Sequence, residues 1–347
     1  MKILRYLLVF IPISFIFEYA HLSETMMFVI SALAIIPLAG LMGEATEEIS
    51  FYAGPKVGGF LNATFGNATE LIIGFFAMKA GLFEVVKASI AGSVIGNILL
   101  VLGVSMLVGG LKFKTQHFNR HAVEVSSSML LFAVIGLIIP AIFTHTVAPS
   151  LLTTKYEGLT ILVSVIMFII YLLSLYFSFH THKDLYSIDH SQESTSKWSL
   201  KKAVLVLIGV TVLIGIESEF FVSAIGPMSK EAGLSNFFIG IILVPIIGNA
   251  AEHSTAVTMA FKNKMDVAVE ITLGSSLQII LFVTPVLILL SLIFSPMSII
   301  FNEFELIALL FSVLIANKVA NDGESNWMEG VQLIAVYIIM AASFFVI

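Results

Sequence analysis

Apolar stretches long enough to cross a lipid bilayer follow one another along almost the whole of this sequence. Of its 347 residues, 58% are hydrophobic and only 12% are charged, whereas a soluble globular domain carries about 25% charged residues. A single soluble core could not bury so much apolar surface, and one transmembrane helix needs about 20 mostly apolar residues. The sequence therefore predicts an all-α integral membrane protein that lies in a lipid bilayer.

About eleven segments are long and apolar enough to be transmembrane helices. The first has no convincing cleavage site and is followed at once by another apolar segment, so we interpret it as a retained span and not as a signal peptide. The approximate limits of the predicted spans are 3–20, 25–46, 57–79, 84–110, 121–145, 156–179, 201–225, 235–261, 266–294, 301–317 and 327–347.

The positively charged residues are distributed unequally between the two sides that these spans define. Thirteen of the 17 lysines and arginines fall on the side of the N-terminus, and four fall on the opposite side. Loops rich in lysine and arginine stay in the cytoplasm. We therefore expect a protein of the cell membrane with a cytoplasmic N-terminus and an extracellular C-terminus.

One short motif occurs twice, each time near the middle of a predicted span. "GNATE" occupies residues 66–70, and "GNAAE" occupies residues 248–252, which is 182 residues later. The same offset aligns Gly92–Ser93 with Gly274–Ser275. Five spans separate equivalent points, and an odd number of crossings inverts the second copy in the membrane. Inverted repeats with a binding site at the membrane midplane are typical of secondary transporters.

The repeat also predicts how the chain is divided. The longest polar stretch is the natural connection between the two copies. We expect an N-terminal transmembrane helix at 1–22, a first five-helix repeat at 23–180, a cytoplasmic linker at 181–200 and a second, inverted five-helix repeat at 201–347.

Each copy of the motif places a glutamate at bilayer depth, Glu70 in the first and Glu252 in the second. A charged side chain there costs about 2.5–3.5 kcal/mol. A protonated glutamate that is hydrogen-bonded to a neighbouring helix is the alternative for either one alone. Because both are accompanied by the same residue types, we favour a shared binding site for a cation or for protons. The accompanying residues are Gly66, Asn67, Gly248 and Asn249.

The sequence predicts a helix break at the second motif more clearly than at the first. In a helix, the glycine and the glutamate of the motif share one face at i and i+4, with the asparagine beside them. Pro245 precedes the second motif and lacks a backbone donor, which predicts a kink or break there. No proline stands at the corresponding position, three residues before Gly66. The first motif must therefore break by other means or remain helical.

The other polar residues predicted at the midplane carry oxygen and nitrogen but no sulfur. Ca²⁺ takes six to eight oxygen ligands from carboxylates, amides, backbone carbonyls and water, and Mn²⁺ also suits such a site. We therefore expect Glu70 and Glu252 to hold the metal ion. His253 adjoins Glu252 and is predicted to form hydrogen bonds or to handle protons. The supporting residues are Ser93, Asn97, Ser275 and Gln278.

Two close carboxyl groups in a desolvated site can hold either protons or one divalent cation. This competition gives exchange if the helices rock only when the site is filled. Glu47 and Glu219 form a second matched pair near helix ends. They are candidates for proton or cation access, and the alternative is that both are simply solvated.

Several other classes of function are not supported by the residues. The chain has no cysteine, which excludes disulfides, thiolate metal sites and cysteine nucleophiles. It has no HExxH or GxSxG motif and no matched aspartate pair, so nothing recommends an intramembrane enzyme. We expect no cofactor and no nucleic-acid partner, while assembly into a homo-oligomer stays open. A cation channel with glutamates as its selectivity ring is a further alternative, although an inverted repeat suits alternating access better.

Three motifs resemble those of the Ca²⁺/cation antiporter superfamily, in its cation/proton exchanger branch and of the prokaryotic type. They are "GNATELIIGFFAM" (66–78), "GNAAEHSTAVTMA" (248–260) and "NDGESNWMEG" (321–330). The resemblance implies one extra helix plus two inverted five-helix repeats, and Ca²⁺ export in exchange for H⁺. It also implies that Glu70 and Glu252 are cation ligands, aided by Asn67, Asn249 and nearby backbone carbonyls. Ser275 and Gln278 resemble a polar motif of the ninth helix in this family.

Overall fold

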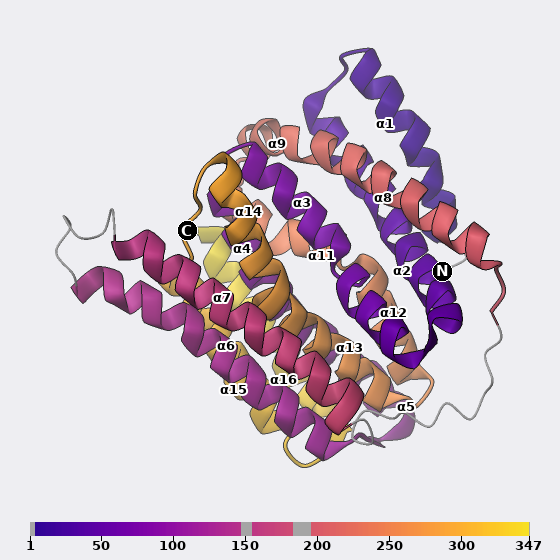
Figure 1. Cartoon of the computed structure of the whole chain (residues 1–347), viewed down its shortest axis with the longest axis vertical. Coiled ribbons are helices and arrows are strands. Elements are labelled where there is room, and N and C mark those ends of the chain that lie inside the picture. Colours follow the sequence, from indigo (N-terminus) through magenta and orange to yellow (C-terminus); the bar gives the residue numbers. More distant parts are fainter. Residues whose placement is uncertain (1–3, 147–154, 183–195, 347) are drawn as a thin grey trace. The chain divides into compact units, whose positions relative to one another are not determined.

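The computed structural model describes residues 4–146, 155–182 and 196–346, and these residues are predominantly helical (Figure 1). Most of the predicted linker at 181–200 lies outside the described residues. Up to residue 182, the elements are η1 (Leu4–Val9), α1 (Phe10–Tyr19), α2 (Glu24–Phe65), α3 (Ala68–Lys79), α4 (Phe83–Ile95), η2 (Gly96–Val101), α5 (Leu102–Phe113), β1 (Thr115–His117), α6 (Arg120–Thr146), α7 (Lys155–Tyr176) and η4 (Phe177–Thr181).

The rest of the chain is helical in the same way, with one short strand. From residue 200 onwards, the elements are α8 (Leu200–Ser223), α9 (Ile225–Ala232), α10 (Asn236–Phe238), η6 (Ile239–Leu243), α11 (Val244–Gly248), α12 (Ala250–Phe261), α13 (Met265–Gln278), η7 (Ile279–Val283), α14 (Thr284–Phe294), α15 (Glu303–Val319), β2 (Glu324–Asn326) and α16 (Trp327–Val346). The first short helix, η1, is a 3-10 helix, and η2, η4, η6 and η7 are π-helical turns.

Several helices are long and apolar enough to cross a membrane, which confirms the prediction that this is a membrane protein. Seven such stretches occur within the described residues, and a bent pair, Ile225–Ala232 with Asn236–Gly248, makes an eighth candidate. The seven are Glu24–Gly54, Phe83–Phe113, Arg120–Thr144, Gly158–Thr181, Leu200–Ser223, Met265–Phe294 and Trp327–Val346.

The remaining predicted spans are interrupted or short, so the total of eleven stays a prediction. The predicted span at 57–79 is divided between the end of α2 and α3, and the one at 235–261 is divided among four short elements. The predicted span at 301–317 corresponds to α15, which has 17 residues. The predicted first span is a 3-10 turn followed by α1, which has ten residues.

The chain packs as two compact units. The first comprises residues 1–89, 189–252 and 347, and the second comprises residues 90–188 and 253–346. The division therefore falls inside α4 and again inside α12, between Glu252 and His253.

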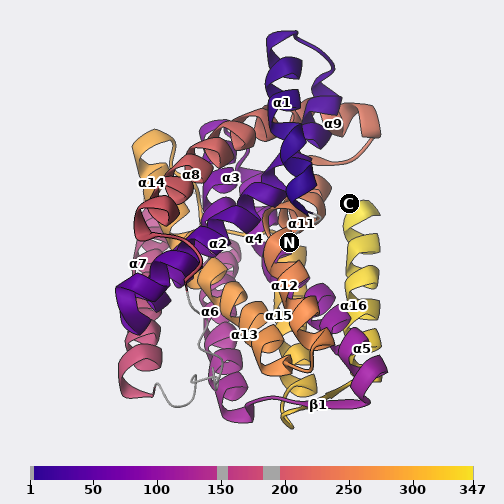
Figure 2. The same cartoon turned by 90° about the vertical axis from the view of Figure 1, so that its right-hand side faces the viewer.

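In the first unit, α2 and α8 pack along each other, while α1 contacts both of them and α3 contacts α8 (Figure 2). Their core includes Leu38 and Met42 from α2, Ala68 from α3, and Val210 and Ile214 from α8. The rings of Phe28 and Phe221 stack at 4.6 Å between centroids. Burying such side chains against one another is the main favourable packing available to these helices once they are in lipid.

In the second unit, α5 and α16 approach so closely that glycine is required at the contact. A Cβ added at Gly330 would lie 2.4 Å from the backbone nitrogen of Leu107, and one at Gly110 would lie 2.2 Å from that of Trp327. Small residues let membrane helices approach in this way. Next to this contact, β1 pairs antiparallel with β2, with Gln116 opposite Ser325.

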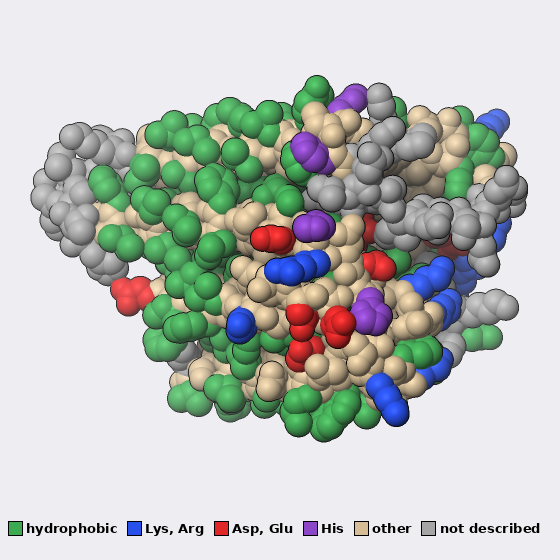
Figure 3. Space-filling view, turned by 90° about the horizontal axis from the view of Figure 1, so that it is seen from below, with side chains coloured by type: hydrophobic (Ala, Val, Ile, Leu, Met, Phe, Trp, Pro, Cys, Tyr) green, Lys and Arg blue, Asp and Glu red, His purple; other side chains and the backbone are tan. Residues whose placement is uncertain are grey.

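The exterior combines apolar helix faces with a polar end. On α8, the exposed side chains include Val204, Leu205, Ile208 and Val212, which recur at helical spacing and so form one face. Figure 3 shows the molecule from below, where lysine, arginine, acidic and histidine side chains gather and hydrophobic side chains occupy the margins. Apolar faces of this kind suit contact with lipid.

Candidate ion-binding site

Both copies of the repeated motif interrupt a helix at their asparagine. In the first, α2 ends at Phe65, and Asn67 has φ −103° and ψ 20° before α3 begins. In the second, α11 ends at Gly248, and Asn249 has φ −94° and ψ 6° before α12 begins. The break that Pro245 predicts is thus present, and the first motif breaks as well, without a proline.

These breaks place each glutamate in the first turn of a new helix. Glu70 is the third residue of α3, and Glu252 is the third residue of α12. The first turn of a helix has unpaired backbone N–H groups and a positive dipole end, which stabilise a carboxylate. The carbonyl groups that end the preceding segment have the opposite polarity and are suited to a cation. A broken helix can therefore stabilise a carboxylate at the start of one segment and a bound cation at the end of the other.

Within the first unit, the Glu70 carboxyl group lies against the backbone of the second motif. A Cβ added at Gly248 would be 3.1 Å from Oε1 of Glu70 and 3.5 Å from its Cδ. Glu70 also interacts electrostatically with Glu252. Its buried Oε2 atom has no hydrogen-bond partner among the described residues. The structure thus places the Glu70 carboxyl group against Gly248 and within electrostatic reach of Glu252, and the shared ion site stays a prediction.

The two asparagines of the motif are buried at the breaks. Asn67 is 0% exposed and Asn249 is 1% exposed. The side chain of Asn249 donates from Nδ2 to the carbonyl oxygen of Pro245 at 3.0 Å. The backbone nitrogen of Asn249 donates to the same oxygen at 3.0 Å, so both donors of this residue hold the end of α11. This contact explains why an amide stands at the break.

A second polar group lies in the second unit. Nε2 of His253 is 2.9 Å from Oδ1 of Asn97, and Nδ2 of Asn97 donates to Oγ of Ser275 at 3.2 Å. Because an amide oxygen can only accept, this contact requires the hydrogen to be on Nε2 of the histidine. The hydrogen-bonding role predicted for His253 is present in this geometry. The remaining supporting residues are close in sequence to Asn97 and Ser275. Ser93 is buried in α4, and Gln278 is the last residue of α13.

Two π-helical turns accompany this group, and no pattern in the sequence indicated them. Asn97 lies in η2, and Ser275 lies near the end of α13, directly before η7. Residues 279–283 of η7 follow residues 97–101 of η2 by the same 182 positions that separate the two motifs. Such turns occur mostly as single insertions in helices and often at functional sites.

The predicted access residues are both exposed. Glu47 is an exposed residue of α2, and Glu219 forms an ion pair with Lys79 at 3.9 Å. Their role in access stays a prediction. The buried carboxyl groups near them are those of Glu48 and Glu217, which sequence reasoning missed.

Glu48 has a full set of hydrogen-bond donors. It accepts from Oγ of Ser196 at 2.7 Å and from the backbone nitrogens of Lys197 and Trp198. These donors are at residues 196–198, directly before α8. Glu48 therefore holds the segment that leads into α8 against α2. The sequence offered no signal that would separate Glu48 from its neighbour Glu47.

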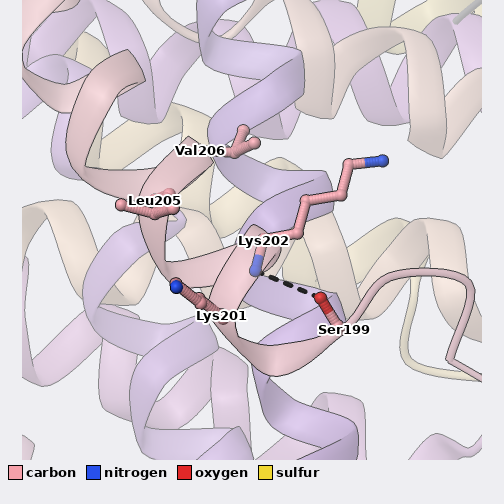
Figure 4. A pocket seen from close by; sticks show the side chains of 5 residues that line it. All are labelled: Ser199, Lys201, Lys202, Leu205 and Val206. Atoms are coloured by element: carbon pink, nitrogen blue, oxygen red, sulfur yellow. Dashed lines mark hydrogen bonds between the residues drawn. The ribbon is translucent and has the colours of Figure 1, made fainter.

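A surface pocket lies at the start of α8 (Figure 4), where Ser199 caps the helix by accepting from the backbone nitrogen of Lys202 at 3.4 Å. Its lining consists of that serine, two lysines and two apolar side chains of the same helix. None of them belongs to the predicted ion site. The lining residues are Ser199, Lys201, Lys202, Leu205 and Val206.

The donor set at the glutamates defines what they can bind. Within residues 4–146, 155–182 and 196–346, no three histidine or acidic side chains come together. A Ca²⁺ ion held by Glu70 and Glu252 would therefore complete its six to eight oxygens from amides, backbone carbonyls and water. The neighbouring asparagines and the broken helix ends supply oxygen of both kinds.

The chain matches known proteins along nearly its whole length. The family described as "Sodium/calcium exchanger protein" matches residues 23–180 and 202–346. A "Ca(2+)/H(+) antiporter" of Aphanothece halophytica is 46% identical, with 98% of this chain and 95% of that protein covered. The "Ca(2+)/H(+) antiporter ChaA" of Bacillus subtilis (strain 168) is 45% identical, with 97% of each covered.

A solved structure agrees with the fold. "Structure of native YfkE" superposes with a TM-score of 0.86 at 42% identity, covering 99% of this chain and 100% of that one. The fold is that of a helical membrane protein in which two helices are interrupted, each with a glutamate in the first turn after the break. The chain belongs to the sodium/calcium exchanger protein family, and these relatives are named as Ca²⁺/H⁺ antiporters.

Proposed function

We propose that this protein is a secondary antiporter that exports cytoplasmic Ca²⁺ in exchange for H⁺ across the cell membrane. The observation that carries the proposal is the buried contact of the Glu70 carboxyl group with Gly248, beside its electrostatic interaction with Glu252. The names of the relatives in Aphanothece halophytica and Bacillus subtilis support the same ions. Those names also favour a transporter over an enzyme.

The exchange follows from what the two carboxyl groups can hold. When both are ionised, they bind one Ca²⁺ with their two negative charges. When both are protonated, the pair is neutral and has no affinity for the cation. Occupation by one ion therefore excludes the other. Two carboxyl groups suggest at least two protons per Ca²⁺.

Alternating access gives this competition a direction. The site opens to one side at a time, and an inward proton gradient loads protons from outside and releases them inside. We propose that the protein has eleven spans, made of one N-terminal helix and two inverted repeats of five helices. The coincident positions of the two breaks and of η2 and η7 at one sequence offset support the repeats. So does the family match, which falls in two segments, 23–180 and 202–346.

The polar group of the second unit serves the same transport cycle in this proposal. His253 adjoins Glu252 in the chain, and its hydrogen bond to Asn97 fixes the orientation of its ring. We assign it a role in handling protons. The excess of lysine and arginine on the side of the N-terminus supports a cytoplasmic N-terminus and an extracellular C-terminus.

Transport in liposomes tests the proposal. The purified protein is reconstituted, a pH gradient is imposed, and Ca²⁺ movement is followed for the parent, for Glu252→Gln and for Glu324→Gln. Glu324 is an exposed acidic residue in β2, so its variant is the matched control. We expect gradient-driven uptake in the parent and the control, and none in Glu252→Gln.

Two results would reject the proposal. Equal flux with and without the gradient would favour a channel, and normal exchange by Glu252→Gln would place the cation elsewhere. Competition by Mn²⁺ in the same assay tests whether Mn²⁺ is the preferred substrate.

A further inference from the structure

A buried carboxyl group outside the repeated motif joins α8 to the N-terminal helix. Glu217 of α8 is 0% exposed, and so is Ser14 of α1. Oγ of Ser14 lies 2.6 Å from Oε1 of Glu217 and 2.7 Å from the carbonyl oxygen of Ile11. Oε2 of Glu217 is buried and has no hydrogen-bond partner among the described residues.

The number of hydrogen atoms at this contact favours a neutral carboxyl group. The hydroxyl group of Ser14 has one hydrogen, but it makes two short contacts to oxygen atoms. The carbonyl oxygen of Ile11 can only accept, so the serine donates to it. The contact with Glu217 then needs a hydrogen of its own, which the carboxyl group supplies if it is protonated. With an ionised carboxylate, one of the two short contacts of Ser14 would join two oxygen atoms with no hydrogen between them.

The surroundings offer nothing that would stabilise a charge on Glu217. Burial of an unpaired carboxylate costs far more than burial of the neutral acid, and Ser14 is the one hydrogen-bond partner of the Glu217 carboxyl group among the described residues. Among the side chains that the structure describes, the titratable groups on the helices that pack against α8 are Glu18 and Tyr19 on α1, Glu24, Glu44, Glu47, Glu48 and Tyr52 on α2, Glu70 and Lys79 on α3, and Lys230 and Glu231 on α9.

Two basic groups near this part of the chain form ion pairs with other carboxyl groups. Arg5 pairs with Glu44 at 2.7 Å, and Lys79 pairs with Glu219 at 3.9 Å. Glu48 accepts hydrogen bonds from the segment that follows the linker. Among the side chains that the structure describes, none forms an ion pair with Glu217.

We propose that Glu217 is a second proton-binding site, separate from the Glu70–Glu252 pair, and that its proton holds α1 against α8. Loss of this proton would remove the hydrogen that joins the carboxyl group to Ser14. The rings of Phe15 and Phe220 meet edge to face at 5.6 Å in the same contact between α1 and α8. The apolar contact alone would then have to keep the two helices together around a buried, unpaired carboxylate. We therefore expect α1 to move away from α8 and water to reach the carboxylate. This inference does not rest on Ca²⁺/H⁺ exchange.

Infrared difference spectroscopy tests the protonation directly. The full chain is reconstituted in lipid without Ca²⁺, and the spectrum of Glu217→Gln is subtracted from that of the parent. We expect a C=O stretch of a protonated carboxylic acid that shifts in D₂O and is lost in the variant. In Ser14→Ala the band should move, because the acid loses its acceptor. A carboxylate band in its place, or a band indifferent to Ser14→Ala, would overturn the proposal.

Distance measurement tests the link to α1. The chain has no cysteine, so Ile16→Cys and Val212→Cys, both at exposed positions, attach spin labels to α1 and α8 alone. We expect the interlabel distance to lengthen as the pH rises in the parent, and to stay short at every pH with Glu217→Gln, whose amide donates permanently. A distance that is independent of pH in the parent contradicts the lock. The Glu70→Gln background separates the two proposals, since it abolishes exchange and leaves this pH response intact.

Discussion

The carboxyl group of Glu70 packs on Gly248, so that a Cβ at position 248 would lie 3.1 Å from Oε1. The glutamate of one motif therefore needs the glycine of the other. Interiors pack too densely to absorb an added methyl group without a shift of neighbouring atoms. Because the neighbour here is the carboxyl group of Glu70, the shift falls on the group proposed to bind the ion.

Gly248→Ala should weaken Ca²⁺ binding by about tenfold, which corresponds to about 1.4 kcal/mol. The added methyl group displaces the Glu70 carboxyl group, while the helix itself tolerates alanine well. The measurement is the Ca²⁺ concentration at half-maximal exchange in liposomes. Gly209→Ala is the matched control, because a Cβ at Gly209 in α8 meets nothing within 4 Å. Equal losses in both variants would show that the effect is general and not local to Glu70.

Ca²⁺ should raise the unfolding temperature of the parent and leave that of Glu70→Gln unchanged. A ligand that binds only the folded state stabilises it by about 2.7 kcal/mol at a concentration 100 times its Kd. The measurement is thermal unfolding in detergent with and without Ca²⁺. Glu324→Gln, at an exposed position of β2, should respond like the parent. A full Ca²⁺ response in Glu70→Gln would place the cation away from this carboxyl group.

The spans and the motif could be predicted from the sequence because each depends on local pattern. Length and hydropathy predict helices such as α6 and α13, and the repeated residues pointed to Glu70 and Glu252. The breaks were only half predictable. Pro245 indicates the break before Asn249, because proline lacks a donor, but the break at Asn67 has no such residue beside it.

The buried carboxyl groups show where sequence reasoning reaches its limit. Glu217 and Glu219 are two residues apart on one helix, and only tertiary packing decides that the first is buried against Ser14 and the second faces Lys79. The π-helical turns at η2 and η7 likewise depend on a single extra residue per turn. Neither the composition nor the spacing of residues indicates which glutamate is buried or where a π-helical turn forms.

Asn249→Ala should lower the stability of the protein by about 0.5–1.5 kcal/mol, the net contribution of one hydrogen bond. The asparagine side chain donates to the carbonyl oxygen of Pro245 at 3.0 Å and is buried. The backbone nitrogen of residue 249 donates to the same oxygen at 3.0 Å, so the variant loses one of two hydrogen bonds to this oxygen and the packing of a buried amide. The measurement is the midpoint of thermal unfolding without Ca²⁺. Asn236→Ala, at the start of α10, is the control for loss of an amide elsewhere in the unit. A midpoint equal to that of the parent would mean that water replaces the cap.

Gly330→Ala should destabilise the second unit through the contact between α5 and α16. Its Cβ would lie 2.4 Å from the backbone nitrogen of Leu107 and 2.5 Å from the carbonyl oxygen of Gly103. Backbone atoms cannot rotate away as a side chain can, so the two helices must separate. Overpacking of this kind costs about 1–3 kcal/mol. Gly158→Ala in α7 meets nothing within 4 Å and serves as the control.

Because the contact between α5 and α16 contains no proposed ion ligand, Gly330→Ala should lower the unfolding temperature and leave the Ca²⁺-induced rise of that temperature intact. Loss of the Ca²⁺ response together with stability would instead show that the helix contact and the ion site are coupled.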